Sequence, residues 1–249
     1  MEKNYYGSLC SKIYDLTKPP GTSIDGDIEF YTQTLMPLDG KILEAGIGNG
    51  RMSIPLLRKG MDLVGLDNSN EMLEMCKINS EHYNVECPLV LGDLRTFEID
   101  EKFEAIIMPN GSFCLLETRE DAIETLKNFK RHLSPTGNIY IDLIYPISFK
   151  PGEKHEFDYE IDTNEEIKLI NFAKEIDWLE QKTFSTLNYH QYSNGVETGF
   201  ESQQFNLRWY GAEEFSLILK ELGFTEISIV KNYNKASMLN LKTVTIIAK

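Results

Sequence analysis

The chain has 249 residues, of which 41% are hydrophobic and 26% are charged, so it can bury the core of one globular domain with a modest insertion. It has no apolar run near the roughly 18 residues of a membrane span and no signal-peptide pattern, so we expect a cytoplasmic protein without a membrane partner. The net charge of −14 argues against a nucleic-acid partner, and the four cysteines form no CxxC pair, so no metal site is expected.

Residues 40–145 alternate short β-rich apolar runs with segments of helical periodicity, which is typical of a parallel sheet with helices on its faces. The apolar runs predict strands at 41–44, 62–66, 87–91, 105–109 and 138–145. The segments between them predict helices at 52–59, 70–79 and 119–132. The breaker cluster Ser134-Pro135-Thr136-Gly137 is expected to end the last of these helices.

The pattern changes after residue 145, where prolines interrupt it and longer alternating strands follow. Asn194-Gly195 predicts a tight hairpin between strands at 184–192 and 196–207, because both residues accept positive φ. A helix at 212–222 and strands at 225–230 and 241–248 complete the chain. We therefore expect an α/β domain made of residues 1–149 and 209–249, with an antiparallel β insertion at 150–208.

The strongest local signal is the run ILEAGIGNGR at 42–51, where an apolar strand leads through Glu44 into alternating glycines. Glycine lacks a Cβ, so this loop can bring its amides against a ligand; a purely structural turn is the alternative. The spacing is ExGxGxG, whereas a nicotinamide or flavin site of the GxGxxG type would place its third glycine one position after Gly50.

Two further acidic residues follow strands. Asp67 lies about 20 residues beyond the glycines, where a carboxylate can accept hydrogen bonds from ribose hydroxyls. Its alternative role is a helix cap, and Ser69 is a competing candidate for that cap. Asp93 stands in Gly92-Asp93-Leu94 after the third strand. Asn110, after the fourth strand, is expected either to touch a cofactor or to stabilise a turn.

Together these motifs resemble those of class I S-adenosylmethionine-dependent methyltransferases. The resemblance implies a Rossmann-like seven-stranded methyltransferase sheet with an inserted antiparallel β lid. It implies S-adenosylmethionine as cofactor. Glu44 is then expected to help hold the ammonium of the cofactor through the loop or a water, and Asp67 to bind the ribose. Asn68 and Met72 are expected to line the adenine, and Asp93-Leu94 to bind its edge. The expected cofactor-binding residues are Tyr14, Glu44, Ala45, Gly46, Gly48, Arg51, Asp67, Asn68, Met72, Asp93, Leu94, Met108 and Asn110.

The place of the insertion resembles that of the substrate lid of bacterial sugar and small-molecule N-methyltransferases. We therefore expect a small-molecule acceptor, with an amine favoured over a hydroxyl because a hydroxyl usually needs a general base. His155 and His190, both in the insertion, are the candidates for that base, against a structural or solvated role. The alternatives are a non-catalytic nucleoside-binding protein and an NAD-dependent oxidoreductase. The insertion could equally form a homodimer interface.

Overall fold

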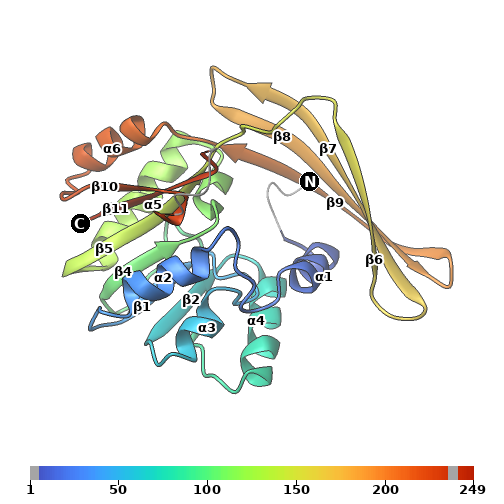
Figure 1. The fold of residues 1–249 in the computed structure, drawn as a ribbon, viewed down its shortest axis with the longest axis horizontal. Helices are drawn as coiled ribbons and strands as arrows, with labels where there is room; N and C mark the ends of the chain where they lie inside the picture. Colours follow the sequence, from blue (N-terminus) through green and yellow to red (C-terminus); the bar gives the residue numbers. More distant parts are fainter. Residues whose placement is uncertain (1–5, 235–240) are drawn as a thin grey trace.

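The computed structural model describes residues 6–234 and 241–249. Its main sheet has seven strands in the order β10-β11-β5-β4-β1-β2-β3 (Figure 1). Five of them run parallel: β1 (Ile42–Ala45), β2 (Leu63–Asp67), β3 (Leu89–Leu91), β4 (Phe103–Met108) and β5 (Leu133–Ile144). The strands β10 (Ser228–Lys231) and β11 (Thr243–Ala248) close the sheet, and β11 is antiparallel to both of its neighbours. This confirms the expected seven-stranded methyltransferase topology.

Helices cover both faces of this sheet, because alternate strand residues point to opposite sides. On one side, Leu43 and Ile106 pack in the cluster that contains α5 (Arg119–His132) and α6 (Ala212–Glu221). On the other side, Ile42 and Ile107 pack with α2 (Asp27–Leu35), α3 (Ser53–Leu57) and α4 (Asn70–His82). In the described part of the chain, no helix is both long and apolar enough to cross a membrane.

The insertion forms a second, antiparallel sheet in the order β6-β7-β8-β9. Its strands are β6 (Lys154–Glu160), β7 (Glu165–Asp177), β8 (Lys182–Ser193) and β9 (Val196–Arg208). Asn194 and Gly195 have φ values of 50° and 76° and join β8 to β9, so the predicted hairpin is confirmed. We call β6–β9 the four-stranded sheet.

The helix α1 (Ser8–Thr17), which the sequence had not indicated, lies between the two sheets (Figure 1). It packs against α4 on one side and against β8 and β9 on the other. Leu9, Cys10 and Ile13 form a small core with Ile167 and Tyr189 of the four-stranded sheet. Because α1 joins the two parts, the division of the chain at residues 150 and 208 stays a prediction; residues 1–5 of the first part lie outside the described structure.

Two short 3-10 turns complete the fold, η1 (Ser112–Leu115) after β4 and η2 (Asn232–Asn234) after β10. Residues 134–137 were expected to form a breaker between the helix and the next strand, but they lie inside the first part of β5. The register of β5 against β4 shifts there, between Phe103 and Ala105. The irregular sequence therefore produces an irregular start to the strand instead of a separate loop.

Candidate cofactor and acceptor site

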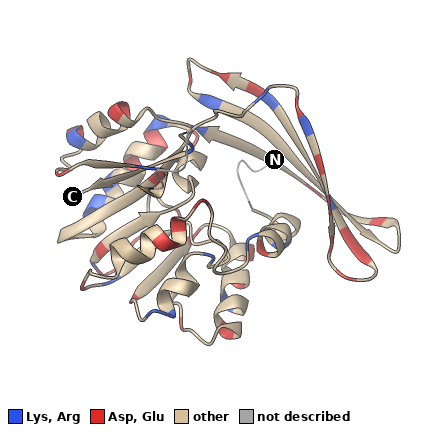
Figure 2. Ribbon diagram, in the orientation of Figure 1, with Lys and Arg blue, Asp and Glu red and all other residues tan. Residues whose placement is uncertain are grey.

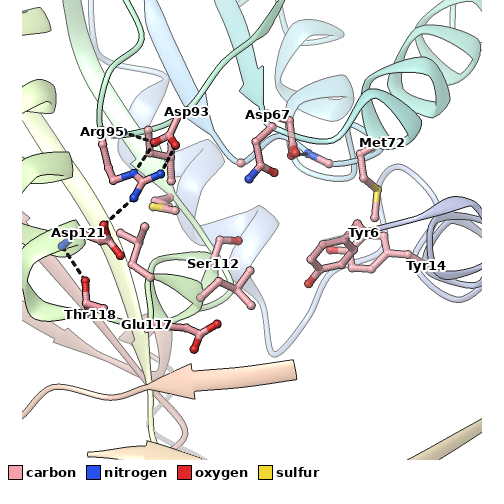
Figure 3. A pocket seen from close by; sticks show the side chains of 17 residues that line it. Tyr6, Tyr14, Asp67, Met72, Asp93, Arg95, Ser112, Glu117, Thr118 and Asp121 are labelled. Atoms are coloured by element: carbon pink, nitrogen blue, oxygen red, sulfur yellow. Dashed lines mark hydrogen bonds and ion pairs between the residues drawn. The ribbon is translucent and has the colours of Figure 1, made fainter. Parts of the chain in front are cut away.

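A cavity of about 410 Å³ opens at the carboxyl ends of β1, β2 and β4 and beside the residues that follow β3 (Figure 3). This is the place where open α/β sheets bind ligands, and the volume lies in the usual range for a small-molecule site. Nine of the thirteen expected cofactor-binding residues line it: Tyr14, Gly46, Gly48, Asp67, Asn68, Met72, Asp93, Leu94 and Met108.

The glycine loop requires its glycines for two different reasons. Gly46, Gly48 and Gly50 have φ values of 78°, 57° and 82°, in the left-handed region that favours glycine. Gly46 and Gly48 line the cavity. A Cβ on Gly50 would lie 2.9 Å from the Cys76 Sγ, so this glycine allows the loop to pack closely on α4.

Asp67, the last residue of β2, is held beside the glycine loop by two backbone amides. Its Oδ2 accepts from the Gly48 N–H and its Oδ1 from the Ser69 N–H, each at 2.9 Å. Burial raises the pKa of Asp67 above its ordinary value. The cap of α4 is Ser69, whose Oγ accepts from the Met72 N–H at 3.1 Å. Since the cap belongs to Ser69, the role left for Asp67 is in the loop and the cavity.

Glu44, Ala45 and Arg51 do not line the cavity. Glu44 is 3% exposed and accepts a hydrogen bond from Ser53 Oγ, and burial raises its pKa to about 8. Ala45 is fully buried in β1. Arg51 forms a buried ion pair with Asp27 at 2.6 Å. The structure therefore places Glu44 and Arg51 behind the glycine loop, where they act on its shape and not by direct contact with a ligand in this cavity.

Asn110 also lies outside the cavity lining, and it serves the turn through its backbone. Its φ is 56°, and its N–H donates to Asp142 Oδ2 at 2.8 Å. Asp142 is fully buried on β5, and burial raises its pKa to about 6, although the hydroxyls of Tyr31, Tyr233 and Thr245 donate to it. Asp142 thus fixes the start of the segment that follows Met108.

Eight lining residues are not among the expected cofactor-binding residues: Tyr6, Arg95, Ser112, Leu115, Leu116, Glu117, Thr118 and Asp121. Arg95 connects two acids, since its Nε donates to Asp93 at 2.8 Å and its Nη1 to Asp121 at 2.7 Å (Figure 3). The hydrogen bond from Arg95 lowers the pKa of Asp93. Arg95 follows Asp93-Leu94 directly in the sequence, so its charge beside the expected adenine site was an available signal.

The helix α1 and the residues just before it bring aromatic side chains to the cavity. Tyr6 and Tyr14 both line it, with their rings edge to face at 6.2 Å (Figure 3). The Tyr6 carbonyl accepts from Ser69 Oγ at 2.8 Å. On the other side, the carboxylate of Glu201 accepts from the N–H groups of Leu9 and Cys10 at 2.9 and 3.2 Å. The placement of Tyr6 and Tyr14 therefore depends on both α4 and β9.

His155 and His190, the expected candidates for a general base, are not brought to this cavity. The His155 side chain is 56% exposed, near Glu153, and borders a separate cavity of about 240 Å³ between β5 and the four-stranded sheet. His190 Nδ1 lies at hydrogen-bond distance from Glu197 Oε1, at 2.8 Å, and its ring lies against Phe200. Strand alternation points His190 away from the face on which Tyr189 packs against α1. The structure does not support either residue as a base here.

The lining suits a cationic nucleoside. S-adenosylmethionine carries a sulfonium and an ammonium, and Asp67, Asp93, Glu117 and Asp121 give the cavity an acidic character. Met72, Leu94 and Met108 offer apolar surface for the adenine and the thioether carbons. Gly46 and Gly48, which lack side chains, leave room beside the loop for the amino-acid end.

Comparisons with known proteins agree with this geometry. The family described as "Methyltransferase domain" matches residues 42–137. The putative methyltransferase YqeM of Bacillus subtilis (strain 168) is 30% identical over 200 residues, which cover 78% of this chain and 77% of that protein. The chain therefore belongs to the class I S-adenosylmethionine-dependent methyltransferases.

Two other similar proteins align with different shares of this chain. The glycine/sarcosine N-methyltransferase of Aphanothece halophytica is 34% identical over 139 residues, 53% of this chain and 52% of that one. The sugar N-methyltransferase KedS8 from Streptoalloteichus sp ATCC 53650 has the same fold, with a TM-score of 0.76 at 17% identity over 100% of this chain and 96% of that one. S-adenosylmethionine is accordingly the cofactor of this chain, and the nicotinamide alternative is set aside.

Proposed function

We propose that this chain transfers the methyl group of S-adenosylmethionine to an amine nitrogen of a small molecule. The observation that carries the proposal is the charge of the cavity: four acidic residues line it, while its one basic lining residue, Arg95, is paired with Asp93 and Asp121. Such a lining attracts a cationic acceptor and repels a phosphorylated one. The relative named as a glycine/sarcosine N-methyltransferase supports the same acceptor class.

The chemistry makes modest demands on the protein. Methyl transfer from a sulfonium is an in-line displacement, so the site must align donor and nucleophile and exclude water. A hydroxyl acceptor also needs a general base, commonly histidine or lysine. Neither residue type occurs among the described residues that line the cavity, where the groups that could accept a proton are carboxylates. A carboxylate attracts an ammonium by its charge and is a weak base toward a hydroxyl, and this favours an amine.

We assign the cofactor contacts to the lining residues by their position. Asp67 would hold the ribose, Asn68, Met72 and Leu94 would contact the adenine, and the backbone of Gly46 and Gly48 would lie beside the methionine portion. Asp93 would accept the adenine amine in competition with Arg95. Tyr14 would cover the cofactor from α1. Glu44, Ala45, Arg51 and Asn110 would act through the loop and the turn that they support.

The acidic run of the four-stranded sheet does not add to the case for an amine. Glu153 pairs with Lys150, and Lys168 pairs with both Glu156 and Asp158. Figure 2 shows the basic residues of these strands mainly in their upper part and acidic residues gathered at their lower end, away from the main sheet. The pairs named here are exposed, so they contribute little to stability. The acceptor preference therefore depends on the cavity alone.

The test begins with the purified protein and two ligands. S-adenosylhomocysteine should raise the melting temperature, since a ligand that binds only the native state stabilises it, whereas NAD should not. Turnover is then followed with methyl-labelled S-adenosylmethionine and matched sets of small amines and alcohols. Label in amines is expected; label only in alcohols would overturn the acceptor class. Binding without turnover on any acceptor, cell extract included, would favour a non-catalytic nucleoside-binding protein.

A cytoplasmic location, the absence of nucleic-acid and membrane partners, and a homodimer built through the four-stranded sheet stay predictions. Cell fractionation and the mass of the protein in solution would test the first and the last of these.

A further inference from the structure

Glu117 occupies a distinctive position in the cavity. It lies in the loop between η1 and α5, two residues before the first residue of α5. It lines the same cavity as the cofactor-binding candidates. In Figure 3 its carboxylate points into the pocket, with Ser112 between it and Asp67. Asp67, Met72 and Asp93, which were assigned above to the ribose and the adenine, do not lie next to it in this view.

The four-stranded sheet fixes this residue at two points. Asn206 Nδ2 donates to Glu117 Oε2 at 3.2 Å. Arg208 Nε donates to the Glu117 carbonyl at 3.0 Å, and Arg208 itself is only 6% exposed. Both donors belong to the last three residues of β9. The buried arginine holds the Glu117 backbone and the Asn206 amide holds its carboxylate, so the residue is restricted in orientation, as a residue that positions a reacting atom must be.

We propose that Glu117 is the catalytic carboxylate that binds the amino group of the acceptor and takes its proton. This inference rests on the proposed amine acceptor. The acceptor arrives as an ammonium and donates a charge-assisted hydrogen bond to the Glu117 carboxylate. It then gives one proton to Glu117, and the free nitrogen lone pair attacks the methyl carbon. A carbon–nitrogen bond forms, the carbon–sulfur bond breaks, and its electron pair stays on sulfur, which becomes the neutral thioether.

The assignment also explains why the insertion and the cofactor domain meet at this loop. The cofactor is held by residues up to Met108, while Glu117 is oriented by Asn206 and Arg208 of β9. The position of the acceptor nitrogen is then set jointly by the end of the main sheet and by the four-stranded sheet. A change at Asn206 or Arg208 would shift the acceptor without removing any cofactor contact assigned above.

The first test needs no knowledge of the acceptor. Sinefungin replaces the sulfur and methyl group of the cofactor by a carbon that carries an amine, so its ammonium lies where the methyl group would be. Calorimetry compares the Kd of sinefungin with that of S-adenosylhomocysteine for the parent protein and for Glu117→Gln. The variant should weaken sinefungin by about tenfold, because it removes a nearby negative charge, and leave S-adenosylhomocysteine within about twofold.

The matched control is Glu120→Gln, which makes the same change three residues away at an exposed position outside the cavity lining. It should alter neither Kd. With an amine from the labelled-cofactor screen, Glu117→Gln should lower kcat/KM by about 100-fold. Glu117→Asp, which keeps the charge, should recover part of the loss. Asn206→Ala should raise the acceptor KM with S-adenosylhomocysteine binding unchanged, as expected of a positioning residue.

The outcomes separate the two proposals. If the parent protein does not bind S-adenosylhomocysteine or methylates no amine, the proposed function fails. If it does both, but Glu117→Gln keeps its ratio of sinefungin to S-adenosylhomocysteine affinity and its kcat/KM, Glu117 only connects its loop to β9 and the inference is overturned. If Glu117→Gln is too unstable to measure, Glu117→Asp and Asn206→Ala decide the question, and unchanged acceptor kinetics in both would refute it.

Discussion

The Asp67→Asn variant tests the cofactor site most directly. A charge-assisted hydrogen bond contributes about 1.5 to 3 kcal/mol, so loss of the Asp67 charge should weaken S-adenosylhomocysteine binding by about 10- to 100-fold. The structure adds a second effect, because the two oxygens of Asp67 accept from the Gly48 and Ser69 amides. An asparagine has one oxygen and can satisfy only one of them, so unfolding free energy should fall by about 1 to 3 kcal/mol.

Calorimetry with S-adenosylhomocysteine and denaturant unfolding without it measure the two effects separately. Asp62→Asn is the matched control, since Asp62 is exposed at the opposite end of the same strand. It should change neither quantity beyond experimental error. An Asp67→Asn protein that loses stability but keeps its Kd would show that Asp67 only shapes the glycine loop, and the ribose assignment would be refuted.

Two further predictions concern residues behind and beside the cavity. The folded-state pKa of Glu44 lies at about 8, above the ordinary value of 4.5, so the native state holds this proton more tightly and its stability should fall as pH rises between these values. Glu44→Gln should remove a slope of at most about 1.4 kcal/mol per pH unit. Urea unfolding of both proteins between the pKa of about 6 at Asp142 and that of about 8 at Glu44 measures this slope, and identical slopes in both proteins would contradict the prediction. Glu201→Ala removes the acceptor for the first amides of α1, so it should lower the unfolding free energy by about 1 kcal/mol and weaken S-adenosylhomocysteine binding by up to about tenfold. The control Glu197→Ala, on the same strand, should change neither quantity. Equal affinities in the two variants would show that α1 docks without this cap.

The sequence predicts the main sheet and the cofactor end of the site well, because both depend on local patterns. Strand ends followed by glycine or an acid specify their own geometry, so Gly46, Gly48, Asp67 and Asp93 reach the cavity as expected. Glu44 was placed correctly in the chain, but its burial against Ser53 depends on the start of α3, which the motif does not describe.

The rest of the site depends on contacts between distant residues. The helix α1 has few strong helical signals of its own, and it is stabilised by Glu201, about 190 residues away in the sequence. The segment after Asn110 is positioned by hydrogen bonds to Asp142 of β5 and from Arg208 of β9. No spacing rule connects such partners, so Glu117 could not be found from the sequence pattern alone.

These long-range contacts change how the four-stranded sheet relates to the cofactor. Every expected cofactor residue precedes position 111, which suggests that the insertion could be removed without loss of cofactor binding. The structure argues otherwise, because β9 contacts both ends of the cavity. Glu201 holds the start of α1, and Gly7 allows its close approach, since a Cβ there would lie 2.6 Å from the Glu201 carboxylate.

Five residues further along the same strand, Asn206 holds Glu117. These two contacts are about 17 Å apart along β9, given a rise of about 3.4 Å per residue. The same strand therefore supports both α1, which carries Tyr14, and Glu117. We expect loss of the four-stranded sheet to remove both supports, and so to weaken S-adenosylhomocysteine binding as well as methyl transfer.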